Sequence, residues 1–203
     1  EFWYNYKNTN TSNRQAIISS NTVWGSGFTQ IQVNHPSHIN HILLWDYDIN
    51  SSNPVLKSTN TFPNNGTWRH VAISRSGSAL KMFVNGTLEN SVTQTGSLDF
   101  SDSYGTYIGY YPSNTGLVAD ISNLRVVKGT AVYTESFRPP TEPLTSITNT
   151  KLLCCNNSSP TGSTITPGTI TNNGATASTD SPFDDTAGFK FGEGGDQNII
   201  KCG

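Results

Sequence analysis

Charged residues and strong helix formers are scarce in this sequence of 203 residues. Only 13% of the residues carry a charge, and methionine occurs once. This scarcity excludes a helical bundle, a coiled coil and a nucleotide-binding α/β enzyme. Asn, Ser and Thr are abundant instead, with 72 residues together, beside 18 Gly and 10% aromatic residues. The many aromatic and β-branched residues exclude a disordered tract, so the composition predicts an all-β protein with many turns.

The sequence also lacks basic clusters and long apolar runs. Its net charge is −2, and no Lys/Arg patch provides a surface for nucleic acid or anionic lipid. The longest apolar run in the front half, residues 42–45, is too short to span a bilayer. We therefore expect neither nucleic-acid binding nor membrane insertion. The chain begins without methionine and inside a candidate strand, so we expect either a processed product or a piece of a longer polypeptide.

Cysteine is rare, with Cys154, Cys155 and Cys202 as the three examples. A small odd number is not typical of a secreted disulfide framework. Two alternatives remain: free thiols, or a bridge from Cys202 to either Cys154 or Cys155. A zinc site is not expected, because no spaced Cys/His set accompanies these thiols.

Alternating apolar and polar residues predict strands in the first three quarters of the chain. Such runs lie at residues 1–7, 16–20, 28–34, 39–48, 67–75, 80–84, 88–92, 104–111 and 117–127. Asn85-Gly86 is a strong tight-turn signal, because both central residues of a type I′ turn need positive φ. No helix is predicted. The pattern indicates a two-sheet antiparallel jelly-roll sandwich over residues 1–155.

The composition changes after Cys155. Residues 156–182 consist almost entirely of Asn, Ser, Thr, Gly, Pro and Ala, and the last residues regain strand character. We therefore predict that residues 156–203 form an extended polar arm that builds no core of its own.

Two segments resemble a known superfamily. Residues 66–89 contain Trp68, His70, Val71 and Ala72, then Val84, Asn85 and Gly86, and resemble laminin-G-like, concanavalin A-like jelly rolls. Residues 121–145 resemble the version found in tail-fibre and other virion structural proteins of aquatic phages. The residues that carry this second resemblance are Arg125, Val126, Val127, Lys128, Gly129, Thr130, Tyr133, Phe137, Pro139 and Pro140. The resemblance implies a jelly-roll fold used for adhesion, scaffolding or assembly, on a virion or outside the cell.

A tyrosine-rich segment is the candidate ligand site. Sugars stack on aromatic faces and form hydrogen bonds with neighbouring amide, carboxylate and hydroxyl groups. The densest set of such residues consists of Asp102, Tyr104, Tyr107, Tyr110, Tyr111 and Asn114. We predict that this set binds surface glycans, against the alternative that the tyrosines cap a half-buried sheet.

Metal sites are weakly indicated. Related jelly rolls often bind calcium through loop carboxylates, and the candidates here are Asp46, Asp48, Asp99, Asp102 and Asp120. The alternative is that these are ordinary turn and strand-end residues. His35, His38 and His41 lie close together but lack an acidic partner. We therefore predict no metal or other cofactor, with calcium as the open alternative.

Catalytic motifs are missing from the sequence. Glycan-cleaving relatives carry a Glu-x-Asp-x-x-Glu strand, and neither this motif nor a Gly-x-Ser-x-Gly elbow is present. We predict a non-catalytic structural and adhesion module of a virion appendage or extracellular fibre. The alternative is a self-assembling filament or shell subunit, joined through its terminal strands to copies of itself or to other modules of a longer chain. A glycan-active enzyme is the third hypothesis.

Overall fold

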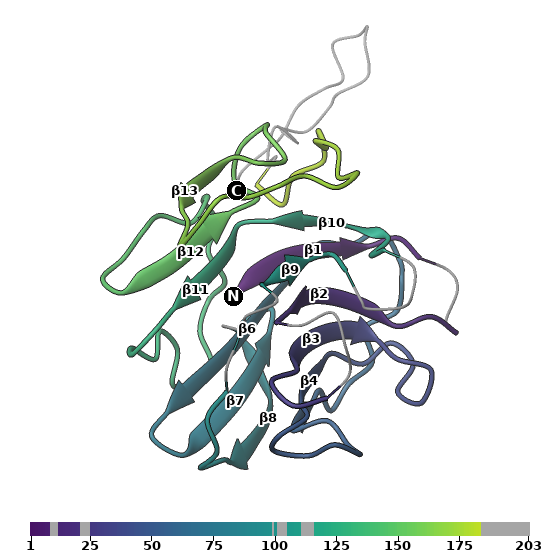
Figure 1. Ribbon diagram of the computed structural model, residues 1–203, viewed down its shortest axis with the longest axis vertical. Helices are drawn as coiled ribbons and strands as arrows, with labels where there is room; N and C mark the ends of the chain where they lie inside the picture. Colours follow the sequence, from purple (N-terminus) through teal and green to yellow (C-terminus); the bar gives the residue numbers. More distant parts are fainter. Residues whose placement is uncertain (9–11, 21–24, 99, 101–104, 111–115, 184–203) are drawn as a thin grey trace, which may run out of the picture.

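A computed structural model describes residues 1–8, 12–20, 25–98, 100, 105–110 and 116–183 (Figure 1). The described part of the chain forms thirteen strands and no helix. Three antiparallel sheets result, two of five strands and one of three. The all-β antiparallel sandwich predicted from the sequence is thus confirmed.

The first sheet has the strand order β10-β1-β6-β7-β8. These strands are β10 (Ala119–Ser122), β1 (Phe2–Tyr6), β6 (Arg69–Ser76), β7 (Ala79–Val84) and β8 (Thr87–Thr93). The second sheet has the order β5-β4-β3-β2-β9. Its strands are β5 (Leu56–Lys57), β4 (Leu43–Asp46), β3 (Thr29–Asn34), β2 (Gln15–Ser19) and β9 (Tyr107–Ile108).

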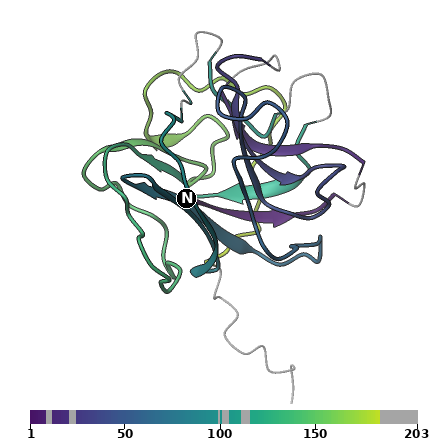
Figure 2. The same cartoon turned by 90° about the horizontal axis from the view of Figure 1, so that it is seen from below.

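A small third sheet has the order β11-β12-β13, with β11 at Leu124–Val127, β12 at Thr150–Cys154 and β13 at Ser163–Ile165. Figure 2 shows it on the opposite side of the molecule from strands β2–β4. It continues the line of the first sheet, because the backbones of Arg125 and Glu1 exchange hydrogen bonds of 2.8 and 2.9 Å.

Strict alternation along β1 places the main core between the two large sheets. Phe2, Tyr4 and Tyr6 are at most 1% exposed and point inward, whereas Trp3 and Asn5 face the other side. Across the second sheet, the register aligns one inward row of apolar residues. That row runs Ile108, Ile18, Ile31, Leu44 and Leu56.

The Asn85-Gly86 turn joins β7 to β8 as the sequence predicts. Both residues have positive φ, 48° and 76°. The Asn85 side chain accepts a hydrogen bond from the His70 amide at 3.0 Å. Phe137 donates its amide to the Gly86 carbonyl at 2.8 Å, so the segment after β11 crosses directly over the turn.

Several strand boundaries differ from the sequence prediction. The single strand expected at residues 117–127 is divided into β10 and β11, because Asn123 adopts a φ of 54° between them. Strands β5, β12 and β13 were not predicted. Each is short and is stabilised by pairing with an earlier strand: β5 pairs with β4, β12 with β11, and β13 with β12.

The described part of the predicted arm contacts the sandwich. Strand β13 pairs with β12 across the boundary predicted at residue 155. Ile170 packs against the main core. Asp180 accepts hydrogen bonds from Asn5 and Trp68, and the Phe183 ring lies 5.7 Å from that of Trp3. Most other residues from 156 to 183 are exposed, as their polar composition predicts.

The close approach of Phe137 makes Gly86 a critical position. A Cβ on Gly86 would overlap the Phe137 carbonyl oxygen, whereas one on Gly77, also at positive φ, would meet nothing within 4 Å. We expect Gly86→Ala to lower the free energy of unfolding by at least about 3 kcal/mol, since overlap adds to backbone strain. Gly77→Ala should cost about 1 kcal/mol. Urea denaturation of both variants checks this, and equal losses would show that Phe137 can retreat.

Candidate functional site

Two residues of the predicted tyrosine set lie side by side in the structure. The rings of Tyr107 and Tyr110 are 5.7 Å apart at 47°. Tyr107 is half-buried, and Tyr110 is 37% exposed. The other four residues of the predicted set, namely Asp102, Tyr104, Tyr111 and Asn114, lie outside the described residues.

The strand register connects these tyrosines to the outer face of the second sheet. Tyr107 pairs with Ser19, Ser19 with Gln30, and Gln30 with Trp45. Because their neighbours Ile108, Ile18, Ile31 and Leu44 point into the core, these four residues face outward. We call Tyr107, Ser19, Gln30 and Trp45 the outer row. The Ser19 hydroxyl also donates to the Tyr110 carbonyl at 3.2 Å.

Two glutamine side chains in the middle of this face are buried and incompletely paired. Gln30 and Gln32 are both 0% exposed. Gln32 Nε2 donates to Gln30 Oε1, but Gln30 Nε2 and Gln32 Oε1 have no hydrogen-bond partner among the described residues. Each orphaned group costs about 1–3 kcal/mol of stability. One donor and one acceptor therefore stay unpaired among the described residues, beneath the surface of this face rather than on it.

The far end of the outer row is covered by a histidine-containing turn. The rings of His35 and His38 lie 5.3 and 6.4 Å from the Trp45 ring. Burial lowers the pKa of His35 to about 4, so its ring is neutral at physiological pH. The third histidine, His41, instead contacts the Ser58 carbonyl through Nδ1 at 3.0 Å. The turn thus supplies aromatic rings to this face.

The candidate calcium ligands at the end of β4 and in the turn that follows it have protein partners. Asp46 Oδ2 accepts a hydrogen bond from the Thr29 hydroxyl at 2.7 Å, and its Oδ1 accepts the Ile49 amide at 3.1 Å. Asp48 Oδ2 accepts the Gly27 amide at 2.8 Å. These carboxylates therefore hold the turn next to the strand ends.

The remaining calcium candidates are separate from that loop. Asp120 forms an ion pair with Lys7 on the first sheet, and Asp99 and Asp102 lie outside the described residues. Nowhere in the described part of the chain do three His, Cys, Asp or Glu residues gather as a metal site would require.

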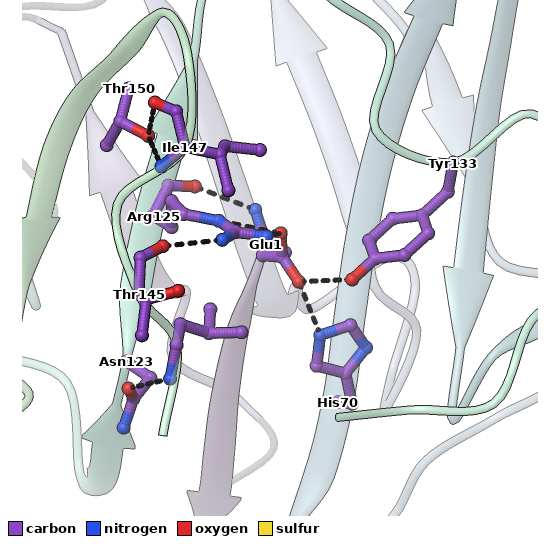
Figure 3. A network of polar contacts seen from close by, with 9 residues as sticks. Glu1, His70, Asn123, Arg125, Tyr133, Thr145, Ile147 and Thr150 are labelled. Atoms are coloured by element: carbon purple, nitrogen blue, oxygen red, sulfur yellow. Dashed lines mark hydrogen bonds and ion pairs between the residues drawn. The ribbon is translucent and has the colours of Figure 1, made fainter. Parts of the chain in front are cut away.

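A second polar cluster is buried at the start of β1 (Figure 3). Glu1 accepts hydrogen bonds from Tyr133 at 2.8 Å and from Arg125 Nε at 3.0 Å, and its Oε2 lies 3.1 Å from His70 Nε2. The side chains of Glu1, His70 and Arg125 are 4%, 0% and 6% exposed. Arg125 also donates to the Thr145 carbonyl at 2.7 Å. The cluster joins β1, β6, β11 and the segment after β11.

Aromatic rings enclose the histidine of this cluster. The Tyr133 and Phe137 rings stack at 3.6 Å, and both meet the His70 ring edge-on. Trp3 approaches the same ring at 5.1 Å. The recurring His, Tyr and Phe residues that carry the sequence resemblance thus form one packed unit with a structural role.

The pKa values of this cluster follow from burial and pairing. Burial opposes ionisation of Glu1, but hydrogen bonds from His70 and Arg125 and the nearby positive charges lower its pKa to about 2. Burial also lowers the pKa of His70, although Glu1 opposes that effect. The cluster holds one carboxylate, whereas glycoside hydrolysis commonly uses a pair.

The outer row was missed by the sequence analysis except for Tyr107. Alternating Gln30 and Gln32 are typical of a solvated strand face, and Trp45 lay within an apolar run. Only cross-strand register brings these residues together, since they come from separate strands.

The fold and the packed His70 unit define a concanavalin A-like sandwich. A laminin-G-type family model, described as the concanavalin A-like lectin/glucanases superfamily, matches residues 1–133. The chain belongs to this superfamily. Neither the curated proteins nor the solved structures yield a match to the chain. Among the described residues there is no helix long and apolar enough to cross a membrane.

The buried carboxylate predicts acid sensitivity. Glu1 ionises more readily in the folded chain, so the stability that it contributes is complete above about pH 4.5 and is lost toward pH 2. We expect Glu1→Gln to lower the free energy of unfolding by roughly 2–3 kcal/mol at about pH 7, and by less than half as much at about pH 3. Denaturant titrations across this pH range measure the difference.

The matched control is Glu135→Gln, which removes an exposed carboxylate. The free energy of unfolding of this variant should match that of the parent protein at every pH. A constant deficit for Glu1→Gln across the pH range would contradict the assignment of this acid response to Glu1.

Proposed function

We propose that this domain is a non-catalytic adhesion module that binds surface glycans at Tyr107 and Tyr110, at the β9 end of the outer row. Domains of its superfamily commonly serve as carbohydrate-binding or adhesion modules. The proposal adds a location for the site, next to Tyr107 and Tyr110. It also places the protein on a virion appendage or extracellular fibre, in line with the sequence resemblance over residues 121–145.

The observation that carries this proposal is the pair of adjacent, partly exposed rings of Tyr107 and Tyr110. A sugar ring presents apolar C–H faces for stacking and hydroxyl groups that both donate and accept hydrogen bonds. Tyr107 and Tyr110 offer the stacking surface. The backbone carbonyl of Tyr110 and the hydroxyl of Ser19 lie next to these rings, and Gln30 and Gln32 are fully buried farther along the sheet.

The arrangement favours binding over catalysis. The outer row contains no carboxylate, and the buried Glu1 accepts hydrogen bonds at both carboxylate oxygens. Neither place offers two carboxylates facing one substrate. We therefore propose that the module recognises glycans without cleaving them.

Alanine substitution of the tyrosines tests the site. We expect Tyr107→Ala and Tyr110→Ala each to weaken binding at least about tenfold, because each removes stacking area. Binding is measured first on an array of bacterial and algal surface oligosaccharides and then by calorimetry with the strongest array ligand. Leu88→Ala on β8, 41% exposed on the other large sheet, is the control and should bind normally. Normal binding by both tyrosine variants would rule out this site.

A second candidate function is assembly into a filament or shell, alone or together with adhesion. The contact of Asp180 and Phe183 with the first sheet favours this assembly function. Asp180 is held by Trp68 and Asn5 at 3.1 Å each, and lies 3.6 Å from Lys7. Phe183 packs on Trp3 beside them. This contact anchors the chain, up to residue 183, on the outer face of the first sheet.

Truncation separates this function from glycan binding. If the chain assembles, the full chain should form oligomers that light scattering and electron microscopy detect. We expect deletion of residues 184–203 to abolish these oligomers, because the segment proposed to contact the neighbour is lost. The anchor residues stay, so thermal stability should change little. Glycan binding should persist. Unchanged oligomers would show that these residues are not needed for assembly.

A further inference from the structure

Cys154 and Cys155 bring their side chains to the same side of the backbone, which consecutive strand residues do not normally do. In a β-strand, neighbouring side chains point to opposite faces. Here the two Sγ atoms are 3.8 Å apart, close to van der Waals contact. The chain must therefore leave the extended conformation at this point, directly after β12.

The backbone of Cys155 accounts for this contact. Its φ is 56°, in the left-handed region that costs a β-carbon-bearing residue about 1–2 kcal/mol. The other four non-glycine residues with positive φ in the described part of the chain are all asparagines, which tolerate this region. The Asn123 amide fixes the bend by donating to the Cys155 carbonyl at 2.8 Å. A strained conformation thus holds the two thiols together.

The two thiols differ in burial and acidity. Cys154 is 1% exposed and belongs to the main core, whereas Cys155 is only partly buried and packs against that core from its edge. The hydrogen bond from Cys154 lowers the pKa of Cys155, although burial opposes that shift. The same pairing and burial raise the pKa of Cys154. Cys155 is therefore the first nucleophile, and Cys154 is placed to react second.

We propose that Cys154 and Cys155 form a redox-active dithiol, which low-molecular-weight disulfides convert reversibly into a disulfide between adjacent residues. The Cys155 thiolate attacks one sulfur of the reagent, forms a mixed disulfide and expels one thiolate. Cys154 then loses its proton, attacks the Cys155 sulfur and expels the second thiolate. The protein loses two electrons and two protons, and the reagent disulfide is reduced to two thiols.

The test uses the full chain with Cys202→Ser, so that only the adjacent pair can react. The probe is 4,4′-dithiodipyridine, a small disulfide whose released thiopyridone absorbs light. We expect two thiopyridones per chain and a protein that retains no adduct and has lost two hydrogen atoms by intact mass. Dithiothreitol should restore the original mass. The Cys154→Ser, Cys202→Ser variant should release one thiopyridone and keep one adduct.

Other results of the same experiment overturn the proposal. If the Cys202→Ser protein keeps a stable adduct on Cys155, or on both cysteines, the pair does not close. If the folded Cys202→Ser protein releases no thiopyridone, the thiols of Cys154 and Cys155 are inaccessible. If the parent chain gives a Cys202 bridge to either residue and the Cys202→Ser protein gives none between Cys154 and Cys155, the terminal cysteine is the true partner. Each result comes from chains that retain both residues, so a folding defect in Cys154→Ser leaves the conclusion intact.

Discussion

The buried carboxylate of Glu1 is the constraint on which the junction of β1, β6 and β11 depends. A carboxylate away from water is costly unless it is paired and hydrogen-bonded. Arg125, His70 and Tyr133 meet this requirement from three different parts of the chain. Because Arg125 also binds the Thr145 carbonyl, the requirement extends to the segment that crosses over the Asn85-Gly86 turn. Pairing one charge therefore orders the end of both the first sheet and the small sheet.

The outer face of the second sheet presents the opposite situation. Gln30 and Gln32 are as well buried as the core, yet two of their polar atoms lack partners among the described residues. An apolar pair at these positions would avoid this penalty without disturbing the inward row beneath. The proposed glycan site therefore rests on the partly exposed tyrosines and not on these buried amides. The first cluster stabilises the fold, and the second gives up stability.

How far the sequence could predict this structure depended on how far apart along the chain the interacting residues lie. The β6–β7–β8 meander and its Asn85-Gly86 turn are local, so alternation and turn chemistry were sufficient. Strands β5 and β13 contain only two or three residues and exist through pairing, which no local pattern reveals. Tyr107 and Tyr110 were found because they are neighbours in sequence. Gln30 and Trp45 join them only through the register of four strands, and the role of His70 required the distant Glu1.

Four of the asparagines have a conformational role, and a comparison with them sets Cys155 apart. Asn40, Asn85, Asn123 and Asn149 all occupy the left-handed region, where asparagine substitutes for glycine at modest cost. Asn123 divides one expected strand into β10 and β11 and then donates its amide to Cys155. Among the described residues, each bend of this kind has asparagine or glycine except the one at Cys155. Since asparagine or glycine would relieve the strain there, the thiol at this position is better explained by its contact with Cys154 than by the bend itself.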